Sequence, residues 1–162
     1  MKYNIFLIGP AGSGKSTLGE YIAYKKKITF LECDKFHNKK NILKMKKGIS
    51  INNKERLKWV MKIKKDLIKK NELNLIIAFS GLILSHRKIL IDKNKKNFFF
   101  FLKTPNKILK ERLSKRKVHF FNPLLLRDQI RLFQTTVDLN ILNSNKSLFY
   151  NYTKINNLIK FY

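Results

Sequence analysis

One short segment near the start of the chain constrains its fold more than any other. Residues 9–16, GPAGSGKS, match the pattern G-x-x-x-x-G-K-[ST] at every fixed position. An apolar run, Tyr3 to Ile8, precedes the segment, and apolar residues follow it at helical spacing from Ser16 onward. A buried strand, a glycine-rich bend and a helix in this order predict a phosphate-binding loop in an α/β protein.

The residue types in this loop suit the binding of phosphate groups. Glycines allow backbone N–H groups to approach an anion closely, and the start of the helix adds partial positive charge. In such loops the lysine reaches the β- and γ-phosphates and the first hydroxyl binds Mg²⁺, which assigns these roles to Lys15 and Ser16. The residues expected to hold the nucleotide are Gly9, Pro10, Ala11, Gly12, Ser13, Gly14, Lys15, Ser16 and Thr17.

Strand-like and helix-like segments alternate along the rest of the chain. Further strands are expected at residues 28–32, 73–79, 97–102 and, more weakly, 139–142, and helices at 53–70, 104–117 and 154–161. In the first of these helices the apolar stripe is expected to consist of Leu57, Val60, Met61, Leu67 and Ile68. Alternation predicts a three-layer α/β/α sandwich, with a mostly parallel sheet and ligands beyond the carboxyl ends of its strands.

The chain is strongly basic, with 36 Lys and Arg against 10 acidic residues and a formal net charge of +26. Such a balance is typical of proteins that bind nucleic acid. The excess here is nearly all lysine spread along the chain, whereas base recognition uses clustered arginines with aromatic residues or a recognition module. We therefore expect salt-sensitive, non-specific contact with polyanions and no specific nucleic-acid partner.

Length and cysteine content indicate the class of protein. The 162 residues are the size of a single domain, residues 1–162, and contain no run of about 18 apolar residues that could cross a membrane. The one cysteine, Cys33, cannot form an internal disulfide, which suits a reducing compartment. A cytoplasmic protein without a membrane segment is the expectation.

Polar residues gather at or after the ends of the expected strands. Each of them is ambiguous alone, because a strand-end aspartate is often a helix cap and paired helix arginines are often a solvated face. Their joint position at one edge of the sheet favours a single site. These residues are Asp34, His37, Arg87, Arg112, Arg116 and His119.

The same segments resemble, in order and spacing, those of the bacterial-type gluconokinases, small P-loop kinases that phosphorylate D-gluconate on its 6-hydroxyl with ATP. The family pattern G-D-x-L-H-P resembles residues 33–38, N-x-x-K-M-x-x-G resembles 41–48, and C-S-A-L-K-x-x-Y-R resembles 79–87. The lid pattern L-x-x-R-x-x-H-F, with a later glutamine, resembles residues 113–129. The resemblance covers about residues 3–135.

This resemblance implies roles for particular residues. Asp34 would either deprotonate the 6-hydroxyl or hold a Mg²⁺-bound water, while Lys15 and Arg116 would stabilise the transferring group. Arg112 and Arg116 would close over ATP, with a lid at about residues 117–127. A bidentate arginine suits the gluconate carboxylate, and Arg56 or Arg87 would supply it. The gluconate pocket would be lined by Asp34, His37, Arg56, Arg87, His119 and Gln129. The resemblance also implies that the protein forms a homodimer.

Some positions depart from the family pattern. Ile83 replaces the lysine of the third block, Leu84 replaces a neighbouring basic residue, and residues 134–136 replace the acidic end of the lid helix. One alternative is therefore a P-loop protein that binds nucleotide with lost or altered kinase activity. A second is a nucleic-acid-associated protein that uses a nucleotide as a switch.

Overall fold

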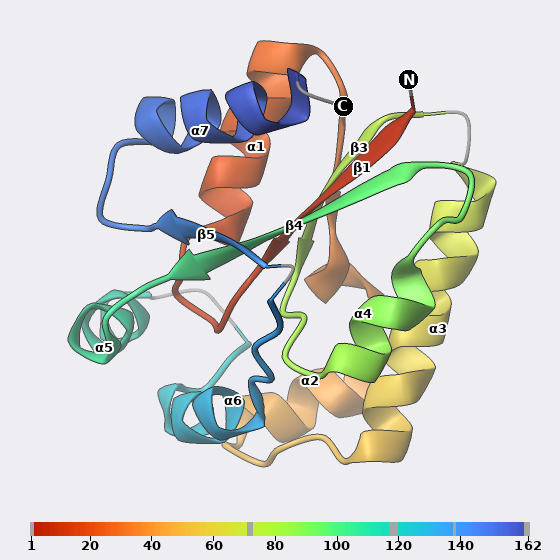
Figure 1. The fold of residues 1–162 in the computed structure, drawn as a ribbon. Helices are drawn as coiled ribbons and strands as arrows, with labels where there is room; N and C mark the ends of the chain where they lie inside the picture. Colours follow the sequence, from red (N-terminus) through yellow and green to blue (C-terminus); the bar gives the residue numbers. More distant parts are fainter. Residues whose placement is uncertain (1, 71–72, 117–119, 138, 161–162) are drawn as a thin grey trace.

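A single parallel sheet forms the centre of the molecule. The computed structural model describes residues 2–70, 73–116, 120–137 and 139–160. Within them five strands run in the order β2-β3-β1-β4-β5, and every neighbouring pair is parallel (Figure 1). The strands are β1 (Tyr3–Ile8), β2 (Thr29–Glu32), β3 (Leu75–Phe79), β4 (Lys96–Lys103) and β5 (Asn140–Asn143). The predicted parallel sheet is confirmed.

Helices cover both faces of this sheet. Helices α1 (Lys15–Lys26) and α7 (Leu148–Lys160) lie on one face, and α3 (Asn53–Lys69) and α4 (Leu84–Leu90) lie on the other (Figure 1). Alternate residues of β1 point to the two layers, so that Ile5 packs in the cluster of α1 and α7 while Phe6 packs in that of α3 and α4. The three-layer α/β/α sandwich is confirmed, and it buries β1 on both faces.

The predicted apolar stripe of α3 is wrong in part. Leu57, Met61 and Ile68 are 44%, 51% and 59% exposed. An α-helix carries residues three, four and seven apart on one face, and the sequence of α3 offers two such apolar faces side by side. Packing on the sheet selected one of them. The buried residues of α3 are Arg56, Trp59, Val60, Ile63 and Leu67.

A third group of helices lies beyond the carboxyl ends of the strands. It comprises α2 (Lys39–Lys46), α5 (Asn106–Ser114), α6 (Leu126–Leu132) and the short 3₁₀ turns η1 (Cys33–Phe36) and η2 (Pro123–Leu125). Sequence periodicity predicted only α5 among them, and α5 ends before Arg116, contrary to expectation. An apolar cluster that includes Met45, Leu113 and Phe121 packs this layer together beside the phosphate loop. None of the helices in the described part of the chain is both long and apolar enough to cross a bilayer.

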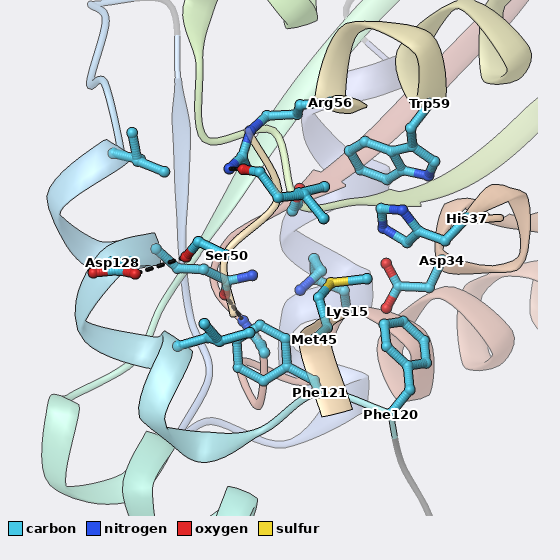
Figure 2. Close-up of a pocket in the computed structure, with 16 residues that line it drawn as sticks. Lys15, Asp34, His37, Met45, Ser50, Arg56, Trp59, Phe120, Phe121 and Asp128 are labelled. Atoms are coloured by element: carbon cyan, nitrogen blue, oxygen red, sulfur yellow. Dashed lines mark hydrogen bonds between the residues drawn. The ribbon is translucent and has the colours of Figure 1, made fainter. Parts of the chain in front are cut away.

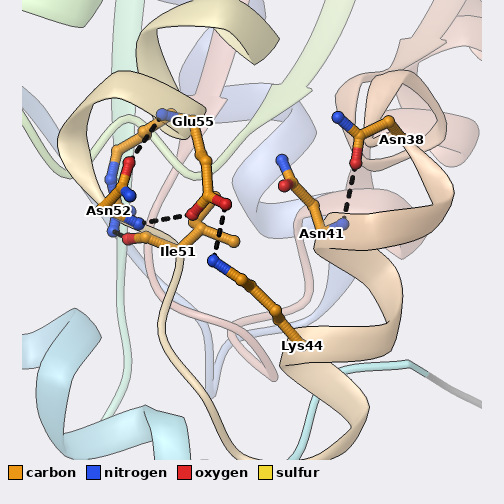
Figure 3. A network of polar contacts seen from close by, with 7 residues as sticks. Asn38, Asn41, Lys44, Ile51, Asn52 and Glu55 are labelled. Carbon is orange, nitrogen blue, oxygen red and sulfur yellow. Dashed lines mark hydrogen bonds and ion pairs between the residues drawn. The ribbon is translucent and has the colours of Figure 1, made fainter.

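Polar contacts fix the connection between α2 and α3 (Figure 3). Asn38 caps α2 by accepting a 2.8 Å hydrogen bond from the Asn41 amide. Asn52 and Glu55 form a reciprocal capping box at the start of α3, with bonds of 2.9 and 3.0 Å. The Glu55 carboxylate also pairs with Lys44 of α2 at 2.6 Å. The first turn of α3, which follows this connection, is therefore held against α2.

Candidate active site

The phosphate loop joins β1 to α1 and has a conformation that only glycine adopts readily. Gly9, Gly12 and Gly14 have φ angles of 147°, 82° and 95°. Gly14 is the N-cap residue of α1 and brings no side chain to the helix terminus. The first amides of α1 are thus positioned to bind an anion, as the sequence predicts.

Lys15 holds the loop in shape through its side chain. Its Nζ donates hydrogen bonds of 2.9 Å to the carbonyl oxygens of both Gly9 and Pro10. Burial lowers the pKa of Lys15, while the carboxylates of Asp34 and Glu32 act in the opposite direction. Phosphate oxygens attract an ammonium more strongly than carbonyl oxygens do, so these contacts give Lys15 a resting position that a nucleotide can replace.

Ser16, the predicted Mg²⁺ ligand, contacts a carboxylate that sequence reasoning missed. Its Oγ donates a 2.5 Å hydrogen bond to Glu32 Oε2 at the end of β2. Burial raises the pKa of Glu32, and the bond from Ser16 opposes that shift. A hydroxyl with carboxylate oxygens nearby fits Mg²⁺, which binds proteins through few oxygen ligands and keeps several waters. The strand-end position of Glu32, two residues before Asp34, was the signal that could have identified it.

A cavity opens beside this loop, with an empty volume of about 600 Å³ (Figure 2). Its walls come from the phosphate loop, η1, α2, α3 and the segment around α6. The lining residues that bear on chemistry are Lys15, Asp34, His37, Ser50, Arg56, Trp59, Asp128 and Gln129.

Asp34 and Lys15 face this same cavity. Asp34 lies in η1, immediately after β2, and its side chain points toward the Lys15 side of the cavity (Figure 2). Burial raises the pKa of Asp34, whereas the positive charges of Lys15 and Arg116 lower it. The structure therefore brings a candidate base and the phosphate-binding lysine to one space.

His37 is a neutral wall of the cavity. Its ring stacks on Trp59 with centroids 4.4 Å apart and planes 11° apart, and Trp59 Nε1 donates a 2.9 Å bond to the Cys33 carbonyl. Burial, together with the charges of Arg56 and Lys62, lowers the pKa of His37 to about 4. At neutral pH His37 can exchange hydrogen bonds with hydroxyls, but it brings no charge for a carboxylate.

The two candidate arginines occupy different places. Arg56 lines the cavity, and its Nη2 donates a 3.0 Å bond to the Ile51 carbonyl. Arg87 is 3% exposed and donates to the carbonyls of Gly81 and Gln134 at 3.2 and 2.5 Å. The described residues that line the cavity include Arg56 but not Arg87.

The lid segment lies against the substrate side of the loop. Gln129 of α6 lines the cavity and accepts a 2.7 Å hydrogen bond from the Ala11 amide through Oε1. Asn122 donates to the carbonyls of Met45 and Lys46, which joins the segment before η2 to α2. His119, a predicted gluconate ligand, lies outside the described residues, as do the other two residues of the segment 117–119.

A second cavity, with an empty volume of about 740 Å³, lies on the other side of the loop. Arg112 donates 3.3 Å bonds to the carbonyls of Gly12 and Ser144, so it joins the loop to the β5–α7 connection. Arg116, which follows the end of α5, also borders this cavity. Sequence reasoning assigned Ser13, Thr17, Arg112 and Arg116 of this lining to the nucleotide, but gave the residues after β5 no role. The lining residues after β5 include Ser144, Lys146 and Asn151.

Comparison with known proteins shows the family of this chain. A protein-family model described as "AAA domain" matches residues 5–119. A Dictyostelium discoideum protein named "Probable gluconokinase" is 35% identical in an alignment 150 positions long that covers 88% of this chain and 75% of that protein. The chain belongs to the gluconokinase family. "Thermoresistant gluconokinase" of Escherichia coli (strain K12), a second relative, is 31% identical over 79% of this chain and 74% of its own length.

Solved structures agree with membership of the gluconokinase family. A gluconokinase from Sinorhizobium meliloti 1021 superposes with a TM-score of 0.80 at 27% identity, and the match covers 98% of this chain and 95% of that one. An unliganded sugar kinase from Janibacter sp. HTCC2649 has a TM-score of 0.88 at 23% identity over 99% and 95% of the two chains. The similarity to the Janibacter sugar kinase shows that the two chains share the P-loop kinase fold.

Proposed function

We propose that this member of the gluconokinase family transfers the γ-phosphoryl group of ATP to the 6-hydroxyl of D-gluconate. The observation that carries the proposal is that Lys15 of the phosphate loop and Asp34 face one cavity, which Arg56 also lines. The reaction needs a binding site for the phosphoryl donor, a base for the hydroxyl and a cation for the carboxylate of the sugar acid, and these three residues can supply them.

The nucleotide would lie across the loop. The amides from Ala11 to Ser16 and the Lys15 ammonium would hold the triphosphate, and the second cavity would take the base between Arg112 and the β5–α7 connection. Ser16 would bind Mg²⁺, and Glu32, which lies beside it, would hold one of the waters of the ion. When bound, the ion neutralises charge on the β- and γ-phosphates.

Gluconate would span the first cavity. The guanidinium of Arg56 would bind its carboxylate, while neutral His37 and the amide of Gln129 would bind hydroxyls. Asp34 would accept the proton of the 6-hydroxyl as that oxygen bonds to the γ-phosphorus and the bond to the leaving ADP oxygen breaks. The raised pKa of Asp34 makes it a stronger base for this step. Lys15 and Arg116 would stabilise the charge that develops on the transferring group.

The departures at residues 83 and 84 bear on the alternative of lost activity. Neither Ile83 nor Leu84 is among the described residues that line the first cavity. The Leu84 amide instead donates a 2.7 Å bond to Gln134 Oε1, which ties the start of α4 to the segment after α6. The isoleucine and leucine at these positions therefore do not occupy the walls of the cavity, which favours retained activity.

Two further properties complete the proposal. A homodimer is the assembly that the family resemblance implies. A reducing, cytoplasmic location is consistent with Cys33, which is free and buried.

An assay of ADP release with Mg-ATP and a panel of acceptors tests the function. Turnover with gluconate, but not with shikimate, ribose or nucleoside monophosphates, is the expected result, and Lys15→Ala and Asp34→Ala should each lower it by about 10²-fold or more. Binding of ATP without turnover of any sugar acid would instead establish the inactive alternative. Stimulation by RNA or DNA in about 0.15 M salt would support the nucleic-acid alternative, since purely charge-driven contacts weaken there.

A further inference from the structure

The first cavity carries a second carboxylate that the proposed reaction does not use. Asp128 lines the cavity from α6, and its Oδ2 accepts a 2.6 Å hydrogen bond from Ser50 of the α2–α3 connection (Figure 2). We propose that Asp128 is a specificity-determining residue that opposes the substrate carboxylate at Arg56 and so weakens the binding of sugar acids relative to uncharged analogues. This inference rests on the proposed function and deepens it.

The charges of the described cavity walls are balanced before any substrate enters. Two cations and two carboxylates line it, Lys15 and Arg56 against Asp34 and Asp128, and His37 is neutral at pH 7. Lys15 serves the phosphate loop and has Asp34 as its main counter-charge. Arg56 is then the cation available to a substrate carboxylate, and Asp128 is the remaining anion.

Arg56 and Asp128 act on each other electrostatically. Burial lowers the pKa of Arg56, and the charge of Asp128 is the influence that raises it. In Figure 2 the Asp34 carboxylate and Asp128 lie on opposite sides of the view, with the Ser50–Asp128 bond on the far side from Asp34. The two carboxylates therefore mark two ends of the cavity.

A linear sugar acid has its reacting hydroxyl at one end and its carboxylate at the other, so the two groups lie at different ends of the cavity. When its reacting hydroxyl lies at Asp34, its carboxylate lies toward Arg56 and in the field of Asp128. Like charges in one cavity repel, and at a partly exposed position such as Asp128 the repulsion is worth on the order of 10-fold in affinity. An amide of the same acid carries no charge and escapes this repulsion.

Ser50 and Asp128 could instead have a structural role, because the hydrogen bond between them links the α2–α3 connection to α6. Two variants separate the roles. Asp128→Asn removes the charge but keeps an oxygen that can accept the bond from Ser50, whereas Ser50→Ala removes the bond and keeps the charge. Glu20→Gln makes the same charge change on an exposed position of α1 and serves as the matched control.

Trp59 provides the measurement. It is the single tryptophan of the chain and lines the cavity, so its fluorescence reports ligand binding without turnover. We expect Asp128→Asn to bind D-gluconate about 10-fold more tightly than the wild type, with a matching decrease in KM, and to bind D-gluconamide unchanged. The gain should shrink in about 0.5 M salt. Ser50→Ala, which keeps the Asp128 charge, should give no such gain in gluconate affinity, and Glu20→Gln should bind gluconate as the wild type does.

Three results would overturn the inference. Weaker gluconate binding in Asp128→Asn would mean that the carboxylate accepts a substrate hydroxyl. An equal gain for gluconamide would mean that charge is not the cause, and an equal effect of Ser50→Ala would assign the pair a structural role. A wild-type protein that neither binds nor phosphorylates gluconate would instead refute the proposed function itself.

Discussion

The Ser16 hydroxyl and the Glu32 carboxylate are joined by a 2.5 Å hydrogen bond, which ties the phosphate loop to the end of β2. The bond brings an anion to the helix terminus where a nucleotide would place its phosphates. A carboxylate at this point is unfavourable for phosphate unless a cation lies between the two. The contact therefore supports a metal position next to Ser16.

Glu32→Ala should impair the use of Mg²⁺ more than the binding of nucleotide. We expect the Mg²⁺ concentration for half-maximal activity to rise about 10-fold, a loss of the size found when outer groups of a metal site are removed. Initial rates against free Mg²⁺ at fixed ATP measure this, with Glu111→Ala on α5 as a control. An unchanged Mg²⁺ dependence would show that Glu32 acts only within the fold.

Lys15→Ala should lower kcat by about 10²- to 10³-fold, because it removes a fixed positive charge from the transferring group. The variant also loses the two bonds to the Gly9 and Pro10 carbonyls, so thermal unfolding should be followed in parallel. Lys58→Ala, at an exposed position of α3, is the matched control and should retain wild-type rates. Equal kcat values for the two variants would contradict the role of Lys15.

Arg56 and Arg87 should respond differently to substitution. Arg56→Lys keeps the charge but loses the planar fork, and we expect the KM for gluconate to rise about 10- to 100-fold with a smaller change in kcat. Arg87→Lys disturbs bonds to the Gly81 and Gln134 carbonyls and should lower the Tm while leaving KM near its wild-type value. Steady-state kinetics and thermal melts distinguish the two, and a reversed pattern would exchange their roles.

Asp34, as the proposed base, should set the acid limb of the pH profile. Burial raises its pKa above the ordinary 3.8, so its ionised form is lost as the pH falls through a value higher than that of a typical aspartate. kcat/KM should decline with falling pH accordingly, and Asp34→Asn should abolish activity across the range. Substantial activity in Asp34→Asn would exclude a role as base.

His37 should make the fold sensitive to acid. Its folded pKa of about 4 lies below the ordinary 6.5, so the unfolded chain binds a proton first as the pH falls. The contribution of His37 to the free energy of unfolding is complete above pH 6.5 and decreases toward pH 4, by up to about 3 kcal/mol. Urea unfolding of the wild type and His37→Gln at pH 7 and pH 4.5 measures the difference. An equal loss in both proteins would contradict the assignment.

Much of the fold could be predicted because its signals are local. The strands at residues 3–8 and 97–102 are apolar runs, and the motif at residues 9–16 has side chains and glycines that suit a single type of turn. The helices α2, α4 and α6 were missed because each is only seven or eight residues long, too short to show a clear period.

The grouping of residues in the candidate site was predicted in part. Lys15, Asp34, Arg56 and Gln129 line one cavity, as the family resemblance implies, but Arg87 bonds to backbone carbonyls elsewhere. Glu32 was overlooked because its strand-end position becomes informative only once the Ser16 hydroxyl is seen to lie beside it. Asp128 and Ser50 escaped because they lie 78 residues apart and meet only in the folded chain.

The sequence by itself determined the phosphate loop, the parallel α/β architecture and the family, because these depend on neighbouring residues and on their periodicity. The tertiary structure alone decided which face of α3 is buried, which arginine reaches the cavity, and that Ser50 and Asp128 come together. The reason is physical. A buried position, a shared cavity and a counter-charge are properties of elements packed against each other, and their free energies arise from contacts between residues distant in the chain.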